Sequence, residues 1–106
     1  MARIALDIYA YRIKKYIGAY YAVLGRLDAL IFTGGIGENA ALIRAGACRG
    51  LSQLGIEIDS EKNKRPLPGA FEIHAEKSMV KVLVIPTNEE LEIAIQTVEK
   101  IKREFG

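Results

Sequence analysis

The sequence has one cysteine, no strong excess of either charge and no long apolar run. Cys48 cannot form a disulfide within the chain and has no metal-binding neighbour at a useful spacing, which indicates a reducing, cytoplasmic setting. The 15 basic and 13 acidic residues give a net charge of +2, too small to predict binding to nucleic acid or a membrane surface. No apolar run approaches the roughly 20 residues of a membrane span, and we expect no secretory signal after Met1.

Familiar catalytic motifs are also scarce. No Gly-Lys-Ser/Thr follows the glycines between Gly34 and Gly37, which excludes a Walker-A loop. His74 is the only histidine, and no nucleophile or carboxylate pattern accompanies it, so we expect it to be structural or exposed and not catalytic. The 106 residues are typical of one domain, and 50% hydrophobic with 26% charged residues is an ordinary globular balance.

Hydrophobic periodicity predicts three main helices. Apolar residues at steps of three or four predict the first helix from about Ile4 to Leu24. A second helical stripe runs from Ile43 to Leu54 and ends at Gly55. The last predicted helix opens at Pro86–Glu90, where Thr87 and Glu90 have the spacing of a capping box. Its apolar stripe comprises Leu91, Ala94, Ile95, Val98, Ile101 and Phe105.

Short apolar runs between these helices predict strands, and so an α/β fold with a small mixed sheet. The run Val80–Ile85 is nearly continuous in aliphatic residues, so we expect it to be buried on both faces. The polar run Asp59–Arg65 and the proline-containing segment 66–69 are predicted to be connecting surface. The other predicted strands are Ala29–Phe32, Ile56–Ile58 and Phe71–His74.

The stretch Asp28–Asn39 combines a strand, a glycine turn and a helix start. Glycine admits a ligand close to the backbone, and a helix N-terminus presents unpaired N–H groups, so the combination suits an anion such as phosphate. The segment Gly35–Ala40 also fits the dinucleotide fingerprint G-x-G-x-x-A, with Glu57 or Asp59 where a ribose-binding acid could lie. Three features disfavour that alternative: a long helix precedes the strand, Glu38 places a carboxylate in the loop, and no second mononucleotide half follows.

Four blocks of the sequence resemble one family in order. These blocks are Ala5–Gly18, Phe32–Asn39, Asp59–Lys64 and Val82–Leu91, and together they resemble the C-terminal part of acetate kinase. The resemblance implies a partial ribonuclease-H-like domain, the fold shared by acetate and sugar kinases and actin-like ATPases. It also implies reversible transfer of the γ-phosphoryl group of ATP to acetate, with ATP/ADP and Mg²⁺ as cofactors.

The resemblance also implies which residues bind. The adenine-nucleotide loop of the family falls on Gly35, Ile36, Gly37, Glu38 and Asn39. Its magnesium-associated acid falls on Glu89, whose place in the first turn of the predicted helix would equally suit the helix dipole. No residue of this chain is assigned a catalytic role.

The groups that bind acetate or another short-chain carboxylate in the family belong to an N-terminal lobe whose motifs are not found here. We therefore expect a fragment with negligible acetate kinase activity by itself. We also expect apolar surface to be exposed and the chain to form a homodimer. A dinucleotide (NAD)-binding module and a non-catalytic interaction module remain the alternatives.

Overall fold

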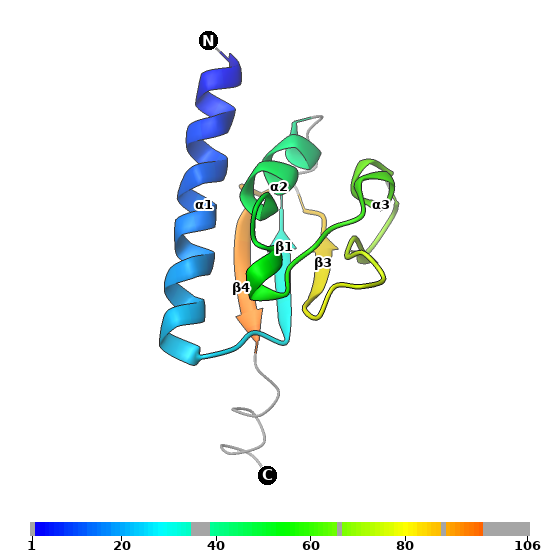
Figure 1. Ribbon diagram of the computed structural model, residues 1–106. Helices are drawn as coiled ribbons and strands as arrows, with labels where there is room; N and C mark the ends of the chain where they lie inside the picture. The colour runs from blue at the N-terminus through cyan, green and yellow to red at the C-terminus, as the bar shows by residue number, and fades with distance from the viewer. Residues whose placement is uncertain (1, 35–38, 66, 88, 97–106) are drawn as a thin grey trace.

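The computed structural model describes residues 2–34, 39–65, 67–87 and 89–96. Within these ranges, three α-helices and one short 3-10 helix accompany a four-stranded mixed sheet with strand order β2-β3-β1-β4 (Figure 1). The central strands β1 and β3 are parallel, and each outer strand is antiparallel to its neighbour. The elements in chain order are α1 (Ala2–Leu24), β1 (Ala29–Thr33), α2 (Ala40–Cys48), η1 (Ser52–Leu54), α3 (Ser60–Lys64), β2 (Phe71–Glu72), β3 (Lys81–Ile85) and β4 (Glu92–Gln96).

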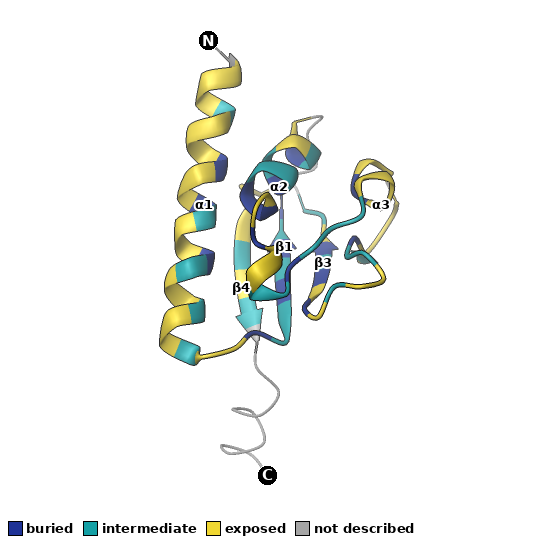
Figure 2. Cartoon of the chain, viewed as in Figure 1, coloured by how far each residue is buried: buried dark blue, intermediate teal, exposed yellow. Residues whose placement is uncertain are grey.

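The core lies between one face of the sheet and the helices α1 and α2. Leu30 of β1 pairs with Val82, and Phe32 pairs with Val84; all four side chains are buried. The helices contribute apolar residues such as Ile17 to the same cluster. The residues that alternate with these on the strands are half-buried or exposed, so one face of the sheet carries the core (Figure 2).

The first helix and the central strand confirm the prediction from periodicity, but the second helix is shorter than predicted. It ends at Cys48, because Arg49 is extended and Gly50 has a positive φ. The predicted stripe then continues in η1. Gly55, the predicted terminator, closes that element in the left-handed conformation and donates its N–H to the Ser52 carbonyl.

The middle of the chain differs from the prediction in three places. Ile58 forms only an isolated bridge to His74 instead of belonging to a strand, and the strand predicted from Phe71 is reduced to two residues, β2. The polar run after Ile58 contains α3, because the side chain of Asp59 accepts the N–H groups of Glu61 and Lys62 as an N-cap. Strand β3 is fully buried on one face only, since its buried residues alternate with exposed or half-buried ones.

The predicted last helix is wrong within the described residues. Residues Glu92–Gln96 form strand β4, which pairs antiparallel with β1. Leu91, Ile93 and Ile95 also fit an alternation of period two, and pairing with the edge of β1 gives the backbone of Glu92–Gln96 hydrogen-bond partners. The predicted capping box does not cap a helix, because Thr87 Oγ1 accepts the N–H of Glu89 at 3.2 Å. The rest of the stripe, Val98, Ile101 and Phe105, lies outside the described residues.

The third α-helix of the structure is therefore α3, and not the element predicted after Pro86. Among the described residues, no helix combines the length and the apolar character needed to cross a membrane.

Candidate functional site

The candidate site lies at the edge of the sheet where the parallel strands β1 and β3 both end. Ligands of open α/β sheets bind outside the carboxyl ends of such strands. Gly34 directly follows β1 and donates its N–H to the carbonyl of Ile85, the last residue of β3, at 2.9 Å. The segments that leave the two strands therefore begin side by side.

Gly34 also touches the backbone of the segment that follows β3. It is buried, its φ is +85°, and a β-carbon here would clash with the carbonyl oxygen of Glu90 and lie 2.7 Å from that of Glu89. Only glycine combines this conformation with so close an approach. The structure thus places the start of the glycine turn against Glu89, as a site made from both segments requires.

Of the predicted site residues, the structure describes Asn39 and Glu89. Asn39 is exposed and stands at the N-cap of α2, where its side chain makes no capping hydrogen bond and its carbonyl accepts the N–H of Ile43. Glu89 is exposed, and its N–H is bound to Thr87. The predicted residues outside the described ones are Gly35, Ile36, Gly37 and Glu38.

Glu89 and its neighbour Glu90 are exposed carboxylates in the segment that leaves β3. Within the ranges that the structure describes, no three His, Cys, Asp or Glu side chains gather as a metal-binding group. A single carboxylate still suits Mg²⁺, which keeps several waters and commonly binds one or two carboxylates together with substrate phosphates. The donor set fits a magnesium–nucleotide complex better than a metal held by protein alone.

Helix α1 supports the segment after β3 through Tyr9. Its hydroxyl donates a hydrogen bond to the carbonyl of Leu91 at 2.8 Å. Burial, and then the charges of Glu90 and Glu92, raise the pKa of Tyr9, so this donor stays protonated at neutral pH. A cavity of about 560 Å³ lies beside this contact, lined by Tyr9, Arg12, Ile13, Tyr16, Tyr20, Glu90, Leu91, Glu92 and Ile93. Nothing in the sequence indicated this contact, because its two residues are 82 positions apart.

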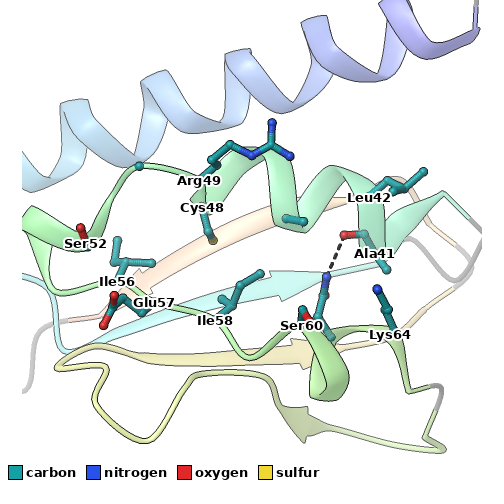
Figure 3. Close-up of a pocket in the computed structure, with 13 residues that line it drawn as sticks. Ala41, Leu42, Cys48, Arg49, Ser52, Ile56, Glu57, Ile58, Ser60 and Lys64 are labelled. Carbon is teal, nitrogen blue, oxygen red and sulfur yellow. Dashed lines mark hydrogen bonds between the residues drawn. The ribbon is translucent and has the colours of Figure 1, made fainter.

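A second cavity, of about 420 Å³, lies between α2 and the segment from Ile56 to Lys64 (Figure 3). Beside it, Arg44 and Asn63 are buried together. Asn63 was expected to be part of a solvated surface, and this expectation is wrong. Its position in the polar run 59–65 gave no signal of burial, because its partners come from α2.

The acids required by the dinucleotide alternative are engaged elsewhere. Asp59 caps α3, and Glu57 lies 3.7 Å from the ammonium group of Lys77. The strand that pairs in parallel with β1 is β3, far along the chain, whereas a dinucleotide unit expects it directly after the helix. His74 accepts the N–H of Val82 at Nδ1, 3.1 Å away, in keeping with a structural role.

Solved structures with this fold define its class. The chain is similar to the acetate kinase of Porphyromonas gingivalis, with a TM-score of 0.72 and 43% identity over 81% of this chain and 22% of that one. It is also similar to a propionate kinase from Francisella tularensis, with a TM-score of 0.65 and 42% identity over 84% of this chain and 22% of that one. The fold is a partial α/β domain of the class that includes these kinases and the actin-like ATPases.

Sequence comparison gives the family. The family model described as the acetokinase family matches residues 1–95. An acetate kinase from Syntrophobacter fumaroxidans is 53% identical over 102 residues, which are 96% of this chain and 25% of that protein. One from Campylobacter jejuni subsp. doylei is 58% identical over 94% of this chain and 25% of that protein. The chain belongs to the acetokinase family and spans about a quarter of the length of these relatives.

Proposed function

We propose that this chain is the C-terminal, nucleotide-binding part of an acetate kinase, whose complete form converts ATP and acetate to ADP and acetyl phosphate. The observation that carries the proposal is the contact of Gly34 with the backbone of Glu89 and Glu90 at the carboxyl edge of β1 and β3. Membership of the acetokinase family supports it.

In this proposal, residues Gly35–Asn39 bind the adenine nucleotide. The N-terminus of α2 directs unpaired N–H groups toward the same edge, where they favour phosphate oxygens. Glu89 holds Mg²⁺, directly or through water. When bound, the metal neutralises negative charge on the phosphoryl oxygens, which is its usual contribution to phosphoryl transfer.

The acyl substrate is acetate or another short-chain carboxylate, bound by parts of the enzyme other than this chain. The chain is similar to both acetate and propionate kinases, so its residues do not distinguish between these two acyl substrates. We further propose that the protein is cytoplasmic and acts as a homodimer. Sedimentation at several concentrations tests the dimer, and a single monomeric species throughout would contradict it.

Calorimetric titration of the chain with ADP, with and without Mg²⁺, tests the nucleotide site. We expect binding that Mg²⁺ strengthens, and we expect Glu89→Gln to remove most of this strengthening without weakening metal-free ADP. Glu76→Gln is the matched control, because Glu76 is also exposed but lies in the turn before β3, at the opposite edge. Tighter binding of NAD than of Mg-ADP, or no binding of any nucleotide, would overturn the proposal in favour of the dinucleotide or interaction module.

A further inference from the structure

Arg44 of α2 and Asn63 of α3 form a buried polar link between the two helices. Only 5% of Arg44 and 4% of Asn63 is exposed. The guanidinium donates from Nε to Asn63 Oδ1 at 2.7 Å and from Nη2 to the Asn63 carbonyl at 3.0 Å. The amide nitrogen of Asn63 donates in turn to the carbonyl of Ala41 at 2.9 Å, the dashed line that ends on Ala41 in Figure 3.

The chemistry of this link is unusual for packing alone. Arginine stays charged in proteins, and removing its charge from water is costly unless hydrogen bonds compensate. The Arg44 guanidinium donates to two neutral oxygens of Asn63 and not to a carboxylate in these two bonds. Burial accordingly lowers the pKa of the Arg44 guanidinium. Two apolar side chains of similar volume would fill this space without the cost of removing a charge from water. What the polar pair provides in addition is directional hydrogen bonds between the two helices.

These bonds join the first half of α2 to α3. Arg44 and Ala41 lie on successive turns, and Asn63 joins both of them to α3. Helix α3 is itself held by the side chain of Asp59 and by the Asn63 N–H, which donates to the Asp59 carbonyl at 2.9 Å. At the other side, Asn39 gives α2 no side-chain cap. Asn63 is therefore a side-chain tie to the first turn of α2, a turn that Asn39 leaves without a side-chain cap.

We propose that Arg44 and Asn63 are positioning residues, which hold the first turn of α2 in the orientation that binds nucleotide. This inference rests on the proposed function, because it assigns to the link the alignment of the helix N-terminus at that site. Neither side chain need contact the ligand for this role.

The test compares Asn63→Ala and Asn63→Asp with the control Ser78→Ala. Ser78 is also a polar link, bonded to Glu57 N–H, Gly55 and Val80, but it lies before β3, at the opposite edge of the sheet. Asn63→Asp keeps an acceptor for Arg44 and gains an ion pair, yet it loses the donor to Ala41. Affinity for Mg-ADP is measured by calorimetry, and the free energy of unfolding is measured by urea titration on the same samples.

We expect both Asn63 variants to weaken Mg-ADP binding about tenfold, which corresponds to the loss of about one hydrogen bond. Ser78→Ala should change affinity less than about twofold, even where it destabilises the chain as much. Unchanged affinity in the Asn63 variants, or an equal loss in Ser78→Ala, would overturn the inference. If Asn63→Ala does not fold, Asn63→Asp gives the same comparison.

Amide hydrogen exchange without nucleotide separates this inference from the proposed function. Loss of the link should accelerate exchange in the first half of α2 in the Asn63 variants more than in Ser78→Ala. If the unaltered chain binds no nucleotide, the proposed function fails, and the exchange result then decides the link by itself. Equal exchange in all variants would overturn it.

Discussion

The thiol of Cys48 lies in the core at the end of α2, with only 5% of the residue exposed. Burial raises its pKa from 9.0 to about 12, and the nearby charges of Arg44 and Lys14 offset this only in part. The reactive thiolate is therefore suppressed. We predict that iodoacetamide at pH 8 leaves the folded chain unlabelled and labels it rapidly in urea, as measured by mass spectrometry. Labelling at equal rates in both states would show that the thiol is accessible.

The same shift predicts how stability depends on pH. The folded pKa of Cys48 lies above the unfolded one, so its contribution is complete below pH 9.0 and is lost as the pH rises toward about 12. The expected loss is about 1.4 kcal/mol per pH unit in that range. Urea titrations at pH 9 to 10.5 measure the slope, and Cys48→Ala, which has no thiol, should show a shallower one. Identical slopes would contradict the shifted pKa.

Gly34 and Gly25 form a matched pair for testing the contact at the candidate site. Both have a positive φ, +85° and +82°, but a β-carbon at Gly25 would meet nothing within 4 Å, whereas at Gly34 it would clash with the backbone of Glu89 and Glu90. We predict that Gly25→Ala costs about 1 kcal/mol, the backbone strain alone. Gly34→Ala should cost at least about 3 kcal/mol, because crowding adds to the strain. Urea denaturation followed by circular dichroism measures both; equal costs would mean that the two segments do not touch.

At the scale of elements, the sequence predicted the segments whose apolar residues fit either the helical period of 3.6 or the strand period of 2, but not both. Helix α1 has a long apolar stripe of period 3.6. Strand β1 is a run of five residues that ends at a glycine turn, and so short an apolar run is typical of a strand. Residues after Pro86 carry both periods, so the presence of a free edge on β1 decides between them. The free edge of β1 exists only once the sheet has assembled, so it could not be predicted from the residues after Pro86 alone.

The site shows the same division. The glycine turn could be recognised from its pattern and Glu89 from the resemblance to the family, and the structure places Gly34 against the backbone of Glu89. The link between Arg44 and Asn63 could not be predicted, because it joins two helices and Asn63 stands among charged, exposed neighbours. Sequence therefore offered candidate groups for a ligand, which stay predictions, but it gave no sign of the buried link between the two helices.

Strand β4 makes a specific prediction about alternate residues. In the strand, Ile93 packs against the core and Ala94 is exposed, whereas the helix predicted from the sequence would bury Ala94. We expect Ile93→Lys to lower the free energy of unfolding by about 2 kcal/mol, because it removes a packed apolar side chain. Ala94→Lys should stay within about 0.5 kcal/mol. Urea titration measures both, and the opposite order would support a helix here.

At the scale of the whole molecule, much apolar surface faces outward. Along α1, Ile4, Ile8 and Tyr11 are each more than half exposed, and the strand residues that alternate with the core are only half covered (Figure 2). Larger exposed apolar patches commonly mark contacts with another protein surface. This distribution agrees with a chain that spans about a quarter of the length of its relatives.

The last prediction concerns activity. Phosphoryl transfer depends on holding donor, metal and acceptor together, and this chain supplies groups for the nucleotide and the metal only, in the function proposed for it. We expect the purified 106-residue chain to form no acetyl phosphate above a protein-free control in a hydroxamate assay with ATP, Mg²⁺ and acetate. Binding of Mg-ADP by the same preparation serves as the control for folding, and a complete acetate kinase in serial dilution sets the detection limit. Turnover at the rate of that complete enzyme would contradict the prediction, because it would mean that these residues contain an acyl site and the groups that stabilise the transferring phosphoryl.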